Sequence, residues 1–218
     1  MQKTFNFLKN IKSNNNRDWF EKHKERYLEA KEEHEIFIDK IIKGIAKFDK
    51  KISPEMKAKD CVFRIYKDVR FSKDKTPYKT NFGASMSPGG KKSLIAGYYL
   101  HAEPGASFLA GGVWMPEPDM LNAIRQEIDY NPDPFFKILN SSSFKKYFKG
   151  LDDEGKLKTA PKGFDKDHPH LDILKNKHFL VSHHFSDKEM NDKDADKLII
   201  AGFKAMHPLI EYLREATS

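Results

Sequence analysis

Features that would mark the chain as extracellular or membrane-spanning are missing from its sequence. Its 218 residues include one cysteine, Cys61, which excludes an intrachain disulfide and a metal site built from several thiolates. No apolar run approaches the ~20 residues that a membrane-spanning helix needs. The first residues, MQKTF, lack the apolar core of a secretory signal. We therefore expect a cytoplasmic protein without membrane contact.

Motifs for catalysis or cofactor binding are missing as well. The sequence contains no G-x-S-x-G nucleophile motif, and Gly111-Gly112 is not followed by the Gly-Lys-Ser/Thr of a phosphate-binding loop. Cys61 has no histidine near it in the sequence that would suggest a catalytic pair. We therefore expect no cofactor, and the sequence does not decide between an enzyme and a binding protein.

The chain is instead rich in charged and aromatic residues. Charged residues make up 33% of it and aromatic residues 12%, which is enough aromatic surface for a packed core. The formal net charge is +7, and residues 57–81 alone hold eight Lys or Arg against three Asp. Most of the excess positive charge therefore lies in one short stretch, and such a stretch attracts anions.

The spacing of apolar residues predicts a single α+β domain over residues 1–218. Residues 1–52 have helical periodicity, and we expect a long helix that is capped by Asn15 and ended by Ser53-Pro54. Residues 61–114 change to the alternating pattern of a sheet. Residues 117–218 return to a helical and mixed pattern that closes with a helix over 194–214.

Five β-strands are expected, over residues 61–66, 79–87, 93–103, 107–114 and 178–185. The first four follow one another through short connections, among them a Pro104-Gly105 turn. Short connections join antiparallel strands, since parallel neighbours need a long crossover. We therefore predict a mainly antiparallel sheet of about five strands, packed with the N-terminal helix and with C-terminal helices.

The most informative stretch is residues 63–82, where apolar and basic residues alternate before a turn. In an extended chain Arg64, Asp68 and Arg70 share one face, from which two guanidinium groups can grip an anion. We interpret the stretch as the basic part of a ligand pocket. Its candidate ligand-binding residues are Arg64, Arg70, Lys73, Lys75, Tyr78 and Lys79, with Trp114 lining the pocket. In a competing interpretation, Arg64, Asp68 and Arg70 form a buried ion-pair network that reaches the N-terminal helix through Asp18.

Histidines provide two further candidates. His101 follows Tyr98 and Tyr99 on an expected strand, so it is a candidate for acid–base catalysis or, alternatively, a histidine that is satisfied within the core. Asp167, His168 and His170 are of the residue types that ligate divalent metals. The same segment also suits the start of a helix with Asp167 as its cap, and we favour this interpretation over a metal site.

Several stretches of the chain resemble a known family of conserved hypothetical proteins, the domain of unknown function 2461. They lie at residues 16–20, 63–79, 97–101, 103–105, 111–112, 114–116, 124–125, 161–164 and 167–169, in order along nearly the whole chain. The longest of them reads FRIYKDVRFSKDKTPYK, in which Lys67 stands where many similar sequences have arginine. The resemblance implies a domain that covers the whole chain, and it implies no activity.

Three functions compete at this point. The first is a cytoplasmic protein, enzymatic or not, with a basic pocket for a small ligand that bears a phosphate or a carboxylate. The second is a nucleic-acid-binding module that uses the 57–81 surface, with Tyr66, Phe71 and Tyr78 as stacking groups. The third is a non-enzymatic structural or interaction domain. Because Asp68 and Asp74 interrupt the basic residues, the charge is focused rather than spread along a groove, which favours the first function.

Overall fold

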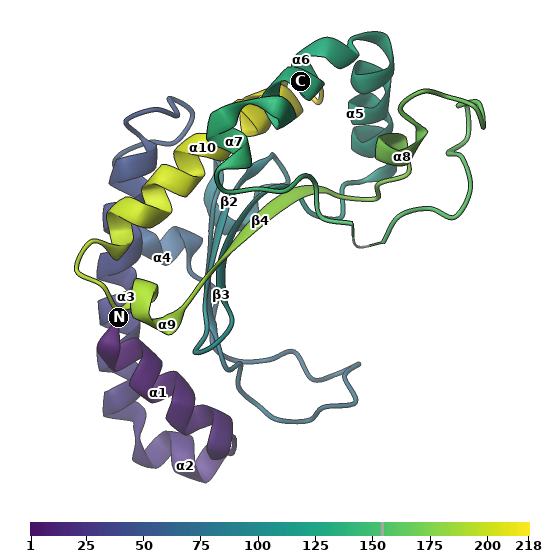
Figure 1. Cartoon of the computed structure of the whole chain (residues 1–218). Coiled ribbons are helices and arrows are strands. Elements are labelled where there is room, and N and C mark those ends of the chain that lie inside the picture. The colour runs from purple at the N-terminus through teal and green to yellow at the C-terminus, as the bar shows by residue number, and fades with distance from the viewer. Residues whose placement is uncertain (154) are drawn as a thin grey trace. The chain divides into compact units, whose positions relative to one another are not determined.

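The computed structural model describes residues 1–153 and 155–218 (Figure 1). The first half of the chain contains α1 (Gln2–Ser13), α2 (Arg17–Lys22), α3 (Lys24–Ile45), α4 (Ala58–Cys61), β1 (Phe82–Met86), the 3₁₀ helix η1 (Gly90–Lys92), β2 (Gly97–Ala102) and β3 (Ser107–Val113). The second half contains α5 (Pro118–Tyr130), α6 (Pro132–Asn140), α7 (Ser142–Lys145), α8 (Leu171–Leu174), β4 (Phe179–Phe185), α9 (Asp187–Met190) and α10 (Ala195–Glu215). The fold is α+β, as predicted.

The strands of the described residues form one antiparallel sheet in the order β1-β2-β3-β4 (Figure 1). Strands β2 and β3 are joined by the turn that was expected at Pro104-Gly105, where Gly105 has a φ of 79°. Glycine adopts this left-handed conformation without the strain that a side chain would cause. The sheet has four strands, so the expectation of about five was slightly too high.

The strand that is missing is the one expected over residues 61–66. Cys61 ends α4, and two isolated antiparallel bridges follow, Val62–Ala84 and Tyr66–Tyr78. These bridges lie four positions apart on the first segment but six positions apart on the second. Extra residues on one side of a ladder interrupt its hydrogen bonds and bend it. Residues 61–66 therefore accompany β1 without forming a regular strand.

The N-terminal segment consists of three helices rather than one long helix. Helices α2 and α3 are separated at His23, whose φ of −118° and ψ of 23° lie outside the helical range. Asn16, rather than Asn15, caps α2, since its side chain accepts a hydrogen bond from the Trp19 amide at 2.9 Å. Asn15 instead donates to the carbonyl of Tyr78 at 2.9 Å and accepts from its amide at 3.0 Å. The segment before α2 is thereby attached to the residues that precede β1.

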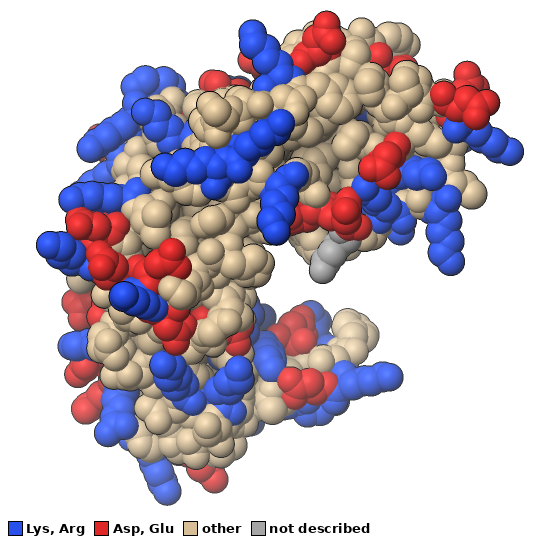
Figure 2. Space-filling view, in the orientation of Figure 1, with Lys and Arg blue, Asp and Glu red and all other residues tan. Residues whose placement is uncertain are grey.

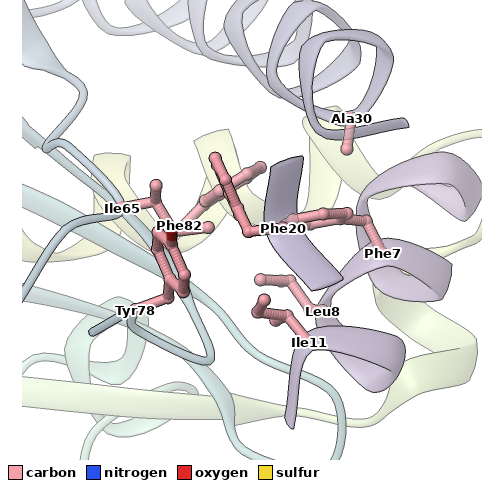
Figure 3. Packing of buried hydrophobic residues seen from close by; sticks show 8 residues of the cluster. All are labelled: Phe7, Leu8, Ile11, Phe20, Ala30, Ile65, Tyr78 and Phe82. Carbon is pink, nitrogen blue, oxygen red and sulfur yellow. The ribbon is translucent and has the colours of Figure 1, made fainter. Parts of the chain in front are cut away.

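Contacts within the chain divide it into two compact units. The first unit comprises Met1–Ser93, Tyr99–Leu109 and His184–Ala201, and the second comprises Leu94–Tyr98, Ala110–His183 and Gly202–Ser218. A cluster of buried residues packs the N-terminal helices of the first unit against the segment around β1 (Figure 3). The cluster contains Phe7, Leu8, Ile11, Phe20, Ala30, Ile65, Tyr78 and Phe82. The cluster includes Ile65 and Tyr78, so both ends of the loop over residues 66–77 are anchored in the core.

The second unit has its core where the C-terminal part of α10 packs on β2 and β3. The Tyr98 ring lies 5.3 Å from that of Phe203, and its hydroxyl is 2.8 Å from Nδ1 of His207. Gly111 leaves room for the sulfur of Met206, because a Cβ at this glycine would collide with it. Helix α10 continues through Pro208 to its end. None of the helices in the described residues is both long and apolar enough to span a membrane.

Alternation along β2 distinguishes two faces of the sheet. Tyr98, Leu100 and Ala102 are buried, whereas Tyr99 and His101 point to the other face and are only half-buried. In the first unit the same face carries Phe108 of β3 and His184 of β4, whose rings lie 5.5 Å apart. The first unit thus exposes polar and aromatic side chains on one face of its part of the sheet.

Candidate functional site

A chain of hydrogen bonds runs along this half-buried face of β2. The hydroxyl of Tyr99 lies 3.1 Å from Nδ1 of His101, and Nε2 of His101 lies 3.0 Å from Oε2 of Glu103. The other carboxylate oxygen of Glu103 accepts from the hydroxyl of Thr80 at 2.8 Å. An ionised carboxylate only accepts, so a neutral His101 donates from Nε2 to Glu103 and accepts at Nδ1 from Tyr99. We call Tyr99, His101, Glu103 and Thr80 the relay.

The relay is shielded from water on the side of β3. The side chains of His101 and Glu103 are 14% and 18% exposed. The ring of Phe108 stacks on the imidazole, with centroids 4.7 Å apart and an interplanar angle of 13°. On the side of β1, Gly83 makes room for Tyr99, since a Cβ at this position would lie 2.6 Å from the tyrosine hydroxyl. The relay is therefore held in place by an aromatic ring on one side and a glycine on the other.

The surroundings of Tyr99 keep its hydroxyl protonated, and this hydroxyl can donate or accept a hydrogen bond in the relay. Burial, and then the negative charge of Glu103, raises the pKa of the Tyr99 hydroxyl to about 12. The phenol therefore keeps its proton near neutral pH and acts as a hydrogen-bonding group rather than as a nucleophile. If His101 takes up a proton, both of its nitrogens donate. Tyr99 then accepts from Nδ1, and its own O–H becomes available to a molecule outside the relay.

A phenylalanine ring connects the relay to a lysine, and an arginine lies close enough to this lysine to act on its charge. The ammonium group of Lys79 sits 5.5 Å from the centroid of the Phe63 ring, and that ring lies 6.4 Å from the ring of Tyr99. Burial, and then the positive charge of Arg64, lowers the pKa of Lys79. Among the residues that the structure describes, neither Lys79 nor Arg64 forms an ion pair. A bound anion would relieve the repulsion between these two charges.

The interrupted ladder explains why Lys79 lies there. The backbone amide of Lys79 donates to the carbonyl of Ile65 at 2.8 Å, and the amide of Phe63 donates to the carbonyl of Gly83 at 2.9 Å. The extra residues between these two bonds include Thr80, which reaches the relay. Bulges re-aim side chains in this manner, and here the bulge presents a lysine and a threonine to β2.

Comparison with known proteins gives a family and no more. Residues 3–212 match the model of a family described as conserved hypothetical protein, DUF2461. The chain belongs to the DUF2461 family. No curated protein matches it, and no solved structure does. The resemblance found in the sequence is thereby confirmed. The description of the DUF2461 family names no activity.

The other basic residues of the 63–82 stretch lie in a surface loop of this DUF2461 protein and bond mainly within it. Arg70 makes a two-pronged contact with Asp68, in which Nε and Nη2 donate at 2.9 and 2.6 Å. Lys67 donates to Asp74 at 2.7 Å, and Lys75 donates to the carbonyl of Val69 at 3.0 Å. The side chains of Arg70, Asp68 and Asp74 are exposed, whereas that of Lys67 is half-buried. These contacts leave the loop with less positive charge to offer than its sequence suggests.

The competing interpretation of a buried ion-pair network is wrong. The side chains of Arg70 and Asp68 are 75% and 47% exposed, and Arg64 and Asp18 are exposed as well. The Arg70–Asp68 pair joins two residues of the same loop, and Asp18 takes no part in it. Residues two positions apart in a tight loop meet before either can reach a helix, which is why the network does not form.

The remaining candidates from the sequence lie in three different environments. Tyr78 is 3% exposed and stacks on Phe20 at 4.1 Å, so its ring belongs to the core of the first unit. Lys73 is exposed in the loop. Trp114 belongs to the second unit, where its indole stacks on His178 at 4.3 Å. The structure thus connects Lys79 to His101 through Phe63 and Tyr99, places Arg64 near Lys79, and places Tyr78 in the core.

In the Asp167–His170 segment the ring nitrogens of His168 both bond within the protein. Nδ1 of His168 accepts from the backbone amide of His170 at 3.0 Å, and Nε2 lies 2.8 Å from Oδ1 of Asp129. Both ring nitrogens are therefore occupied. In the described part of the chain, no group of three or more histidine, cysteine or acidic residues is arranged to hold a metal ion. Asp167 does not cap a helix either, because α8 begins only at Leu171.

Sequence reasoning identified His101 but missed its partners. Tyr99, His101 and Glu103 alternate in the sequence, so their shared face follows from the two-residue period of a strand. That signal was present and was sufficient to group the three residues. Nothing in the sequence indicated that Thr80 would reach Glu103, because this contact depends on the bulge that precedes β1.

Proposed function

We propose that this protein binds a small ligand bearing a phosphate or a carboxylate on the half-buried face of β2. Lys79 and Arg64 hold the anionic group. Tyr99, the member of the relay whose ring neighbours that of Phe63, forms a hydrogen bond to the ligand. The observation that carries the proposal is the pair of neighbouring cations without an ion pair in the described residues. A half-buried lysine beside an arginine is unfavourable until an anion neutralises both.

The relay gives the ligand a second contact. With His101 neutral, Tyr99 donates inward and accepts from a donor group on the ligand. With His101 protonated, Tyr99 donates outward to the anion. Either arrangement satisfies every polar atom of the relay, so a ligand is accommodated without leaving a buried group unpaired.

The test is to map the binding of inorganic phosphate and sulfate by amide chemical shifts and by thermal melting. We expect saturable shifts in residues 63–82 and 97–108. A ligand that binds only the folded protein stabilises it by about 2.7 kcal/mol at a hundredfold excess over its Kd. Lys79→Ala is expected to raise the Kd roughly tenfold, since it removes a charge-assisted hydrogen bond.

Two loop cations serve as matched controls. Arg70→Ala and Lys73→Ala remove the same charge from exposed positions, and we expect both to keep the wild-type response. Arg70→Ala is also expected to change the free energy of unfolding by no more than about 0.5 kcal/mol, as exposed ion pairs contribute little. An equal loss of response in Lys79→Ala and in both controls would refute the proposed site, because it would show general charge attraction.

One observation favours nucleic-acid binding as a second function. Phe71 is 96% exposed, and the guanidinium of Arg70 lies 5.9 Å from its ring, which suits stacking on a base. Against this stand the core position of Tyr78 and the pairing of the loop cations. In the segments visible in Figure 2, basic and acidic side chains are interspersed rather than gathered into a stripe. Oligonucleotide binding that falls steeply with salt and is lost in Phe71→Ala would favour this second function.

A further inference from the structure

The second unit contains a cavity that the proposed function does not use. It has a volume of about 330 Å³ and lies between α5 and the segment over residues 157–164. Five of its lining residues come from α5, Tyr130 at the end of the helix and four others at spacings that place them on one face. These four are Asn122, Arg125, Gln126 and Asp129, and Lys162 and Phe164 face them from the other segment. The volume is that of a pocket for a small molecule.

Arg125 supplies a buried positive charge at this cavity. It is 5% exposed, its Nε donates to the carbonyl of Leu174 at 2.8 Å, and its Nη2 donates to that of Asn176 at 3.0 Å. A guanidinium has five N–H donors, and these two bonds use two of them. Within residues 1–153 and 155–218, no carboxylate forms an ion pair with Arg125, and burial lowers its pKa. The two carbonyls fix the side chain but leave its charge to be neutralised.

Asp129 supplies a fixed acceptor one helical turn further along α5. The His168 ring accepts at Nδ1 from the amide of His170, so its Nε2 carries the proton and donates to Oδ1 of Asp129. The Asp129 side chain is 32% exposed. Its carboxylate is therefore oriented by the histidine while it still lines the cavity.

We propose that this cavity binds a small hydroxy acid or amino acid. The carboxylate of the ligand lies against Arg125 and Lys162, and its hydroxyl or amino group donates to Asp129. Residues four apart on a helix have Cβ atoms about 5–6 Å apart, which is a span that adjacent groups of one small molecule can bridge. The ring of Phe164 covers the carbon skeleton. Arg125 recognises charge, and Asp129 recognises the donor.

The experiment compares L-malate with succinate, which have the same two carboxylates and differ by one hydroxyl. Binding is measured by calorimetry and mapped by amide shifts on the full chain. We expect malate to shift residues 122–130 and 157–164 and to bind roughly tenfold more tightly than succinate, because a hydrogen bond to a charged acceptor is worth about that factor. Equal affinities, no saturable malate binding, or malate shifts confined to residues 63–108 would overturn the proposal.

Variants separate the two recognition groups. Lys162→Ala is expected to weaken both ligands roughly tenfold, whereas Asp129→Asn is expected to reduce the preference for malate and still accept from His168. Lys166→Ala is the matched control, since Lys166 is exposed nearby but does not line this cavity. Lys79→Ala should leave malate binding here unchanged, so failure of the first-unit site and failure of this one are distinguishable. A loss of malate preference in Lys166→Ala equal to that in Asp129→Asn would overturn the assignment.

Discussion

Replacement of Gly83 by alanine is the sharpest test of the relay geometry. A Cβ at this position lies 2.6 Å from the hydroxyl oxygen of Tyr99 and 3.2 Å from two of its ring carbons. The first distance requires Tyr99 to move, and movement weakens its hydrogen bond to His101. Overpacking of this kind costs about 1–3 kcal/mol. It opposes the gain of about 0.4–1 kcal/mol that Gly→Ala gives by restricting the unfolded chain.

The same replacement in a Tyr99→Phe background provides the control. Without the hydroxyl, the nearest atoms are the ring carbons at 3.2 Å, which need to shift by only a few tenths of an ångström. Tyr99→Phe by itself is expected to cost about 1 kcal/mol, because Nδ1 of His101 loses its donor. The added cost of Gly83→Ala should then fall by roughly 1–2 kcal/mol relative to wild type, a coupling typical of residues in contact.

Urea denaturation of the wild type, both single variants and the double variant measures this coupling. The midpoint and the slope of each transition give the four free energies of unfolding. If Gly83→Ala costs the same with and without the hydroxyl, then Tyr99 does not lie over Gly83 as described. In that case the position of Tyr99 in the relay is wrong as well.

Two further predictions concern the first unit. Asn15→Ala removes the side-chain partners of the Tyr78 backbone amide and carbonyl, and it should lower the free energy of unfolding by about 1–3 kcal/mol in urea denaturation. Asn14→Ala is the control, because the Asn14 side chain bonds to the carbonyl of Asn10 at the exposed end of α1. This control should change the free energy of unfolding by less than about 1 kcal/mol. His34 is fully buried, its ring nitrogens have no hydrogen-bond partner in the described residues, and burial lowers its pKa to about 3. The unfolded chain therefore binds a proton that the folded chain does not, and stability falls as pH drops from about 6.5 toward 3. His34→Leu should remove this part of the loss, and an unchanged pH profile of the unfolding midpoint would contradict the assignment.

The sheet was predictable where local signals decide. Strands β2, β3 and β4 follow from alternation, and the Pro104-Gly105 turn between two alternating runs predicts the β2–β3 hairpin. Residues 61–66 carry an equally good strand pattern, yet they form only bridges. Their failure depends on the register against residues 78–84, which a single stretch of sequence does not contain. The breaks around Asn14 and His23 in the N-terminal helices depend likewise on partners elsewhere, such as the backbone of Tyr78 for Asn15.

The basic composition of the candidate site was predictable from the sequence, but which of its basic residues form ion pairs was not. The sequence shows that basic residues gather between 57 and 81, but not which of them keep an anionic partner. Lys67 reaches Asp74 because the Tyr66–Tyr78 bridge closes the loop and brings these residues together, whereas Arg70 meets Asp68 only two positions away. The Lys67–Asp74 ion pair therefore follows from loop closure, which is a tertiary property.

Loop closure also separates the two kinds of cation in this stretch. Arg64 and Lys79 lie just outside the Tyr66–Tyr78 bridge, and within the described residues neither forms an ion pair with an aspartate of the loop, although the charge of Arg64 still acts on Asp68. On that side of the bridge, Lys79 meets the ring of Phe63 and the charge of Arg64 instead. A cation that lies over an aromatic ring and is repelled by a neighbouring cation still attracts an anion. Arg70 attracts a further anion less, because its charge is already paired with Asp68. The bridge that closes the loop thus separates the basic residues that pair with loop aspartates from Arg64 and Lys79, which form no ion pair in the described residues.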